Sequence, residues 1–270
     1  MTDAQAPPTP TARRTALVTG ASSGFGELFA ERFAADGFDV VLVARSADPM
    51  EALAERIRTR SHANATVIAH DLAEQGAVAS LMTTLQTRGL HVDALVNNAG
   101  FSTYGPFADA DPGITTKMLM VNVVAMTELA RACLPGMLER GWGRVVLLGS
   151  VGSFSAAPMT AAYAATKAYV LSLGLALHEE LKGTGVTVTT LCPGPTATGF
   201  QARASMADSA LIRSGLDSAE SVVDAGYAAM KKGTPYLVTG TTSRLFALGT
   251  RFIPRTVASK IAGNAQRRVS

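Results

Sequence analysis

The stretch Thr15–Gly26, with the sequence TALVTGASSGFG, decides the fold class of this chain. Its first five residues form an apolar, β-branched run that predicts a short strand, and Gly20, Gly24 and Gly26 follow directly. Glycines at these positions let the backbone turn tightly and approach a bound pyrophosphate. A helix beginning near Phe25 would offer free N–H groups and the positive end of its dipole. The spacing G-x-x-x-G-x-G is not the commoner G-x-G-x-x-G, so the motif alone also fits an ordinary glycine-rich turn.

Outward from this stretch, strand patterns alternate with helix patterns. The near-continuous apolar run Asp39–Ala44 is typical of a strand covered on both faces. Further strands are predicted at Ala65–His70, Val92–Val96, Gly143–Gly149, Val186–Leu191 and Tyr236–Val238. Helices are predicted at Phe25–Gly37, Pro49–Arg60, Glu74–Arg88, Thr115–Arg140 (bending near Pro135), Ala161–Lys182 and Ser218–Lys231. This alternation predicts an α/β fold, a doubly wound parallel sheet of Rossmann-like type, with three layers and a single domain.

The chain divides into three parts. Residues 1–13 are polar and Pro-rich and lack the apolar core of a signal peptide, so we expect a disordered lead. Residues 14–240 are the predicted dinucleotide-binding catalytic domain, and residues 241–270 are predicted as basic amphipathic helices broken at Pro254. Residues 225–270 carry eight Lys or Arg and no Asp or Glu. Such a tail could cover a substrate site, alter subunit contacts, rest on an anionic membrane surface or simply present a solvated face.

Composition excludes several classes of function. The net charge of +3 gives no global signal for nucleic-acid binding. Cys133 and Cys192 have no metal-ligand spacing and lie among apolar residues, so we expect reduced, buried thiols, no metal site and a cytoplasmic location. The uncharged stretches 145–166 and 183–202 are too rich in Gly, Pro, Ser and Thr for convincing membrane spans.

Small and polar residues follow six predicted strands. Ligands of open α/β sheets bind beyond the carboxyl ends of the strands, so these residues are expected to line one crevice. The candidate cofactor-binding residues are Gly20, Ser22, Ser23, Gly24, Phe25, Gly26, Arg45, Asp71, Leu72, Asn98, Ala99, Gly100, Pro193, Gly194, Thr196 and Thr198.

Two of these positions bear on the nucleotide. NAD-binding sites usually place Asp or Glu after the second strand, whereas Arg45 suits the 2′-phosphate of NADP(H). Asp39 is at the wrong end of its strand to replace that acid. Asp71 could accept a hydrogen bond from an adenine amino group or cap the next helix.

Tyr163 and Lys167 form the candidate chemical centre. Their i, i+4 spacing places both side chains on one face of a helix, although this spacing alone is common by chance. A nearby ammonium lowers the pKa of a phenol, and a phenol so tuned can exchange a proton with a carbonyl oxygen. Ser150 ends the preceding strand and could hydrogen-bond the same oxygen.

The order and spacing of these elements resemble the short-chain dehydrogenase/reductase family from about Thr15 to Val238. The resemblance rests on Thr19–Gly26, Asp71, Asn97–Gly100, Asn122, Ser150, Tyr163, Lys167 and Pro193-Gly194.

This resemblance implies an NADP(H)-dependent oxidoreductase that forms a homodimer or homotetramer. Tyr163 would be the general acid/base, and Lys167 would lower its pKa and hold the nicotinamide ribose. Ser150 would orient the substrate, Asn122 would support a water-linked proton relay to Lys167, and Thr198 would contact the carboxamide. The hydride chemistry itself belongs to the cofactor.

The substrate is predicted to be an apolar or acyl-like carbonyl or secondary alcohol, handled in the reductive direction. Apolar residues in the loops after the fourth, fifth and sixth strands support this prediction, although they also fit ordinary core or subunit contacts. They are Phe101, Tyr104, Phe154, Met159, Phe200, Met206, Leu211 and Ile212, and Pro195–Ser214 is expected to be a mobile lid.

Two other functions remain as alternatives. A module that binds NADP(H) without turnover is disfavoured by the complete set of catalytic residue types. A serine hydrolase using Ser22 is suggested by the G-x-S-x-G match at Gly20–Gly24. That elbow normally follows a central strand and not the first, and it needs a later acid followed by a histidine. The last histidine, His178, lies in a predicted helix.

Overall fold

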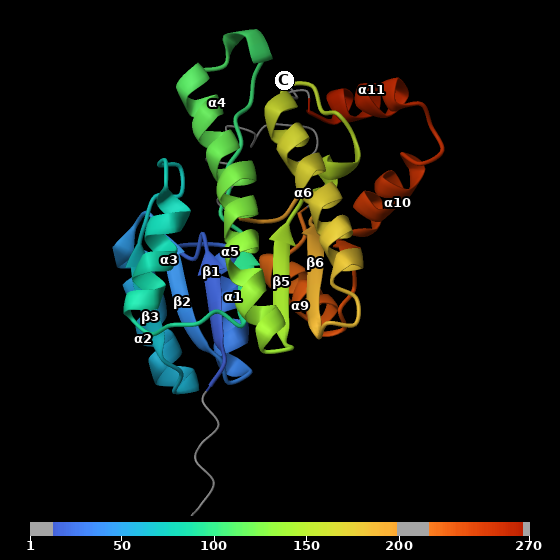
Figure 1. Ribbon diagram of the computed structural model, residues 1–270. Coiled ribbons are helices and arrows are strands. Elements are labelled where there is room, and N and C mark those ends of the chain that lie inside the picture. The colour runs from blue at the N-terminus through green and yellow to red at the C-terminus, as the bar shows by residue number, and fades with distance from the viewer. Residues whose placement is uncertain (1–12, 199–215, 267–270) are drawn as a thin grey trace, which may run out of the picture.

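The computed structural model describes residues 13–198 and 216–266, and within them seven parallel strands form one sheet. The strands are β1 Thr15–Thr19, β2 Asp39–Ala44, β3 Ala65–Ala69, β4 Ala94–Asn97, β5 Gly143–Leu148, β6 Val186–Cys192 and β7 Tyr236–Val238. Their order is β3-β2-β1-β4-β5-β6-β7, so the direction of strand addition reverses between β1 and β4 (Figure 1). This confirms the predicted doubly wound, Rossmann-like single domain, and the reversal marks the edge where such folds bind ligands.

Helices cover both faces of the sheet and complete three layers (Figure 1). One face carries α1 Phe25–Ala35, α2 Ala47–Ser61 and α9 Ala219–Lys231. The other carries α3 Ala77–Thr87, α5 Met126–Glu139 and α6 Ala161–Glu180.

Side chains alternate between two hydrophobic cores along each strand. In β1, Ala16 and Val18 join the core under α1, α2 and α9, whereas Leu17 joins the core on the opposite face. All five residues of β1 are buried, which explains why the strand has an apolar sequence on both faces.

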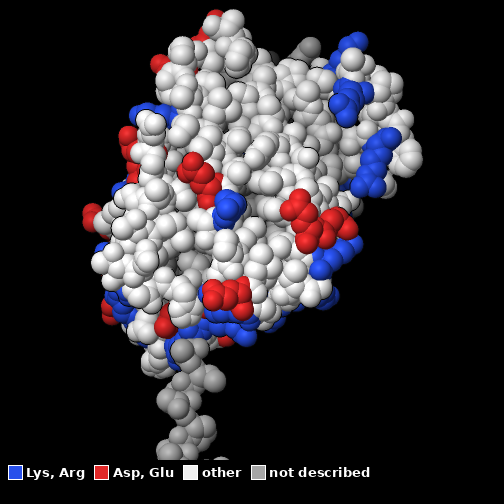
Figure 2. Space-filling view, viewed as in Figure 1, with Lys and Arg blue, Asp and Glu red and all other residues white. Residues whose placement is uncertain are grey.

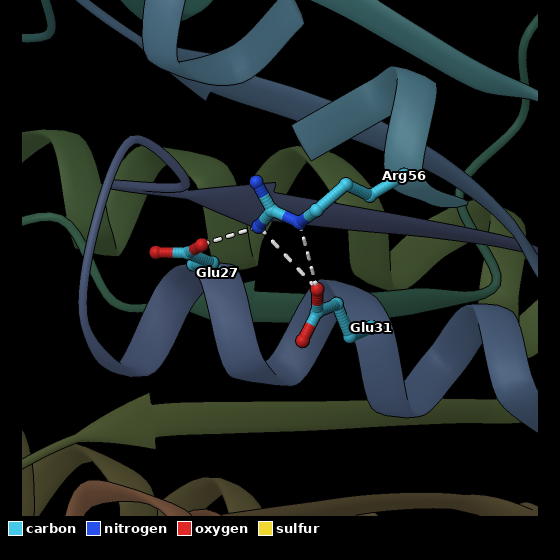
Figure 3. Close-up of polar contacts among 3 residues, drawn as sticks. All are labelled: Glu27, Glu31 and Arg56. Carbon is cyan, nitrogen blue, oxygen red and sulfur yellow. Dashed lines mark hydrogen bonds and ion pairs between the residues drawn. The ribbon is translucent and has the colours of Figure 1, made fainter. Parts of the chain in front are cut away.

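Helix α1 is tied to its neighbour α2 by a partly exposed ionic cluster. The guanidinium of Arg56 on α2 contacts the carboxylates of Glu27 and Glu31, which lie one turn apart on α1 (Figure 3). The cluster therefore joins α2 to α1, the helix that follows the glycine turn.

Helix α2 begins earlier than predicted, and helix α3 begins later. α2 begins at Ala47, two residues before Pro49. α3 begins at Ala77 and not at Glu74, because Gly76 has a φ of +73° and takes the left-handed conformation at the N-cap.

The long helix predicted at Thr115–Arg140 consists of three successive segments. They are α4 Pro112–Leu119, the π-helical segment η2 Met120–Ala125, and α5. The sequence placed the irregularity near Pro135, but Pro135 lies inside an uninterrupted α5. The change of hydrogen bonding falls instead around Asn122, as is common for π-turns near functional groups.

One stretch of the described chain, Pro112–Glu139, is long and apolar enough to cross a membrane, with a mean hydropathy of 1.3 in its most apolar window. Of that window, 44% is buried inside the fold, and α5 packs against β4 and β5. Core helices of globular domains have the same composition, so this stretch is weak support for a membrane span.

The described part of the tail forms α10 Thr241–Gly249 and α11 Arg255–Gln266, with Pro254 between them. Both follow β7 at the edge of the sheet far from β2 and β3 (Figure 1). α10 contacts β7 and the 3-10 segment η3 Val151–Phe154, which directly follows β5.

Candidate active site

The predicted strand-end residues converge on one cavity of about 1060 Å³. Its lining includes Gly20, Ser22, Ser23, Gly24, Phe25, Arg45, Asp71, Leu72, Asn98, Ala99, Gly100, Ser150, Tyr163, Lys167, Pro193, Gly194, Thr196 and Thr198. Gly26 and Asn122 were also predicted as site residues, but they do not line the cavity.

The glycine turn after β1 requires glycine at its three positions for two different reasons. Gly20 and Gly24 have φ values of +66° and +61°, a region that other residues rarely adopt. Gly26 lies in α1, where a Cβ atom would collide with the carbonyl oxygen of Gly20 and approach within 2.8 Å of Asn98 Nδ2. Gly26 therefore serves the site by letting α1 pack closely against the turn.

Thr19 joins the ends of β1 and β4, a role that the sequence did not reveal. Its Oγ1 accepts hydrogen bonds from the backbone N–H groups of Asn98 and Ala99, both at 3.0 Å. Asn98 Nδ2 donates to the carbonyl oxygen of Thr19 at 2.9 Å. The position of Thr19 inside the glycine motif was visible, but its partners lie about eighty residues away in the chain.

Arg45, Asp71 and Leu72 form the end of the cavity at β2 and β3. Arg45 is exposed at the rim. Asp71 Oδ1 accepts from the N–H of Ala73 at 3.0 Å and holds its own loop. Asp71 does not cap α3, because that helix begins six residues later.

Ser150, Tyr163 and Lys167 meet at the end of β5 and the start of α6. Ser150 Oγ accepts from the N–H of Gly152 at 3.1 Å, and its side chain also hydrogen-bonds Tyr163. Lys167 Nζ is buried, donates to the carbonyl oxygen of Leu148 at 2.6 Å and lies 5.6 Å from the centre of the Tyr163 ring. The i, i+4 pair therefore does share one face of the helix.

The pKa of Tyr163 differs in direction from the sequence prediction. Burial raises the pKa of Tyr163 to about 12, against a smaller opposing effect of the hydrogen bond with Ser150. Burial also lowers the pKa of Lys167 to about 8, so desolvation weakens the cation that was expected to stabilise a tyrosinate. Tyr163 in this environment keeps its proton near neutral pH.

Asn122 is buried behind Gly100. Its Oδ1 accepts from the N–H of Phe101 at 3.1 Å, and its Nδ2 donates to the carbonyl oxygen of Phe101 and to Thr166 Oγ1. A Cβ on Gly100 would lie 2.9 Å from Asn122 Oδ1 and 3.7 Å from Lys167 Nζ, so both groups converge on this glycine. Thr166 was not predicted, and it connects Asn122 to the helix that carries Tyr163.

The substrate side of the cavity differs from the prediction. Phe101 lines the cavity, but Tyr104, Phe154 and Met159 do not. Phe154 instead packs near Tyr236, with ring centres 6.2 Å apart. The tail, for which covering a substrate site was one of the expected roles, contributes Phe246, Ile261, Ala262, Ala265 and Gln266 to this wall. Phe200, Met206, Leu211 and Ile212, and most of the predicted lid Pro195–Ser214, lie outside the described residues.

Comparisons with known proteins identify the family of this chain. A family model described as short chain dehydrogenase matches residues 14–208. A short chain dehydrogenase of Pseudocercospora fijiensis is 37% identical over 183 residues, which are 67% of this chain but only 59% of the relative's length. The chain therefore spans less than two thirds of that relative.

Two solved structures are similar over most of their length. A short-chain dehydrogenase from Sphingobium yanoikuyae, in complex with NADPH, is 33% identical with a TM-score of 0.77, covering 88% of this chain and 94% of that one. A bulky-bulky ketone specific alcohol dehydrogenase from Comamonas testosteroni is 31% identical with a TM-score of 0.76, covering 90% and 93%. The chain belongs to the short-chain dehydrogenase/reductase family, a family of oxidoreductases.

This membership removes the hydrolase alternative at Ser22. Contrary to the expectation from chain order, β1 lies in the interior of the sheet, so strand position does not count against a nucleophile elbow. His70 and His178 hydrogen-bond backbone carbonyl groups, and His91 lies beside Asp93. The exclusion of the hydrolase therefore rests on family membership.

Proposed function

We propose that this protein reduces apolar ketones or aldehydes to alcohols, with NADP(H) as its cofactor and Tyr163 as the proton donor. The observation that carries the proposal is the group formed by Ser150, Tyr163 and Lys167 on the wall of the cavity. In the reductive direction the phenolic proton of Tyr163 goes to the carbonyl oxygen, so the protonated phenol is the form that acts.

The residues at the β1–β4 end of the cavity fit a dinucleotide. The first turn of α1 has no side-chain cap, so its N–H groups and helix dipole are available to a pyrophosphate next to Gly20 and Gly24. Arg45 at the rim would hold the 2′-phosphate, and the NADPH complex of the Sphingobium relative supports this choice of nucleotide. Lys167 would hold the nicotinamide ribose, and Thr198 the carboxamide. When bound, the cofactor supplies the hydride.

The chain's own side chains would position the substrate and deliver the proton. Ser150 would donate a hydrogen bond to the carbonyl oxygen, and Tyr163 would transfer its phenolic proton to the same atom as negative charge develops there. Lys167 and Asn122 would replenish that proton through water, and the convergence of both groups on Gly100 supports this role.

The substrate is an apolar carbonyl compound. Phe101, Phe246 and Ile261 give the cavity apolar walls beyond Tyr163. The name of the Comamonas relative, specific for bulky-bulky ketones, supports the same class of substrate.

A screen of ketones, aldehydes and secondary alcohols with NADPH, NADH and their oxidised forms tests the proposal through the nicotinamide absorbance. We expect ketone reduction with NADPH. The Tyr163→Phe variant should lose about 10²- to 10⁴-fold in kcat while its affinity for NADPH, measured by fluorescence, is unchanged. An unchanged kcat in this variant would refute the role of Tyr163. NADPH binding with no turnover of any substrate would favour the non-catalytic module.

Self-association as a homodimer or homotetramer is part of the proposal. Leu119, Leu138, Tyr169 and Leu175 are large apolar residues on α4, α5 and α6 with exposed fractions of 36–42%, and a subunit contact would cover them. Light scattering coupled to gel filtration should give a mass of two or four chains, and a single-chain mass at micromolar concentration would contradict it.

The last part of the proposal is that the protein is cytoplasmic and contacts an anionic membrane through its tail. Leu245, Leu248 and Phe252 are exposed by 66%, 53% and 80%, beside the exposed Arg251 and Arg255. In Figure 2 the surface over α11 shows Lys and Arg without Asp or Glu. Co-sedimentation with vesicles should require anionic lipid and should weaken in the Leu245→Ser, Phe252→Ser variant. If the wild type does not bind vesicles, the proposed membrane contact is wrong.

A further inference from the structure

The C-terminal helix α11 lies over the cavity at the end where Tyr163 stands. Ile261, Ala262, Ala265 and Gln266 of this helix line the cavity. The opposite end is formed by loops after β2 and β3, which are separated from β7 by the other strands of the sheet. α11 therefore faces the substrate and not the adenine end.

α11 contacts the loop after β4 and the segment that leads into α6, the helix that carries Tyr163. Tyr104 Oη donates to the carbonyl oxygen of Gln266 at 2.6 Å, and Gln266 Nε2 donates to Thr160 Oγ1 at 3.5 Å. Thr160 is the N-cap residue of α6, three positions before Tyr163. Gly263 lies against Pro158, where a Cβ would be 3.1 Å from Pro158 Cγ. These contacts join α11 to the segments that flank the cavity near Tyr163.

The lining positions 261, 262, 265 and 266 share one face of the helix, since residues four apart are neighbours. Two of them are alanines, so this face leaves space inside the cavity that a larger side chain would occupy. None of the described Lys or Arg residues of the tail lines the cavity, so the part of the wall that α11 contributes carries no charge.

We propose that this face of α11 is a distal substrate subsite, sized by Ala262 and Ala265, which takes the larger apolar substituent of the carbonyl compound. The inference rests on the proposed function for the reaction itself, but it concerns only which compounds fit. A long alkyl chain or a second bulky substituent would pack on Ile261 and on the two alanines.

A homologous pair of methyl ketones, 2-butanone and 2-undecanone, tests the subsite in the full-length protein. The variants are Ala262→Leu and Ala265→Leu. Asn264→Leu is the matched control, because it adds the same side chain at an exposed position of the same helix. Thermal melting checks that all three variants remain folded.

We expect the two alanine variants to lose about 10- to 100-fold in kcat/KM for 2-undecanone, mainly through KM, while values for 2-butanone stay within about twofold. The control should match the wild type with both ketones. Equal losses for the two ketones, no loss for either, or the same loss in the control would overturn the subsite.

A binding measurement keeps this test separate from that of the reaction. Calorimetric titration of 2-undecanone into the complex with NADP⁺, which cannot reduce it, should show weaker binding in Ala262→Leu and Ala265→Leu than in the wild type and Asn264→Leu. Equal binding by all four proteins would contradict the subsite even if ketones are reduced. Selective weakening would support the subsite even if turnover is absent and the proposed function fails.

Discussion

The two ends of the cavity are built in different ways. The nucleotide end is made of short turns at the ends of β1 to β4, in which Gly20 and Gly24 adopt positive φ and Thr19 binds the backbone that follows β4. The substrate end is closed by contacts between distant parts of the chain, since Tyr104 and Gln266 are 162 positions apart and Thr160 and Gln266 are 106 apart. A site whose cofactor end is made by turns at the strand ends can change its substrate by changing a tail outside the sheet.

Lys167 stands where the two ends meet, and its removal should have the largest effect. We expect Lys167→Met to lower kcat by about 10²- to 10³-fold, because the variant loses both the contact to the nicotinamide ribose and the charge beside Tyr163. Steady-state kinetics with NADPH measure this loss, and Lys182→Met is the control, since Lys182 is an exposed partner of Glu179.

The same variant has a pH signature. The pKa of Lys167 is lowered by burial from 10.5 to about 8, so between these values the unfolded chain binds more protons than the folded one. The free energy of unfolding of the wild type should therefore rise relative to Lys167→Met as pH increases from 8 to 10.5. Below pH 8 Lys167 is charged in both the folded and the unfolded chain, so the wild type should carry the full free-energy cost of burying this charge. Parallel pH profiles of thermal stability would show that Lys167 is not desolvated.

Arg45 tests the nucleotide end alone. The Arg45→Asp variant should raise KM for NADPH by about 10- to 100-fold, because a charge-assisted hydrogen bond is replaced by repulsion. Its kinetics toward ketones at saturating cofactor should stay near those of the wild type. A retained preference for NADPH over NADH would refute the assignment of Arg45.

Gly26 tests whether the nucleotide end depends on close packing. Gly26→Ala should lower the free energy of unfolding by about 1–3 kcal/mol, since the new methyl group meets the Gly20 carbonyl and Asn98 Nδ2. Gly249→Ala is the matched control at the end of α10, where a Cβ would meet nothing within 4 Å. Chemical denaturation should give a lower free energy of unfolding for Gly26→Ala than for Gly249→Ala. Similar free energies would mean that the turn accommodates the new methyl group.

Arg56 should have the smallest effect. Its partners on α1 and its own side chain are 32–37% exposed, so the cluster in Figure 3 is worth roughly 0.2–1 kcal/mol. Arg56→Ala should lower stability by no more than that and leave KM for NADPH unchanged. An increase in KM above about threefold would show that the cluster also orients α1 for the nucleotide.

Much of the fold was predictable because its signals are local. The apolar runs of β1 and β2 and the glycines after β1 depend on neighbours within a few residues. The π-helical segment around Asn122 was not predictable, since it arises where Asn122 bonds Phe101 and Thr166 from other parts of the chain.

The sequence by itself determined which residue types end each strand, and so nearly all of the site residues that it predicted between Gly20 and Thr198 line the cavity. Only the tertiary structure decided the pKa of Tyr163 and the position of α11. A pKa depends on how much water every surrounding atom excludes, and the substrate wall depends on which distant helix packs there. Neither quantity is a property of neighbouring positions in the chain.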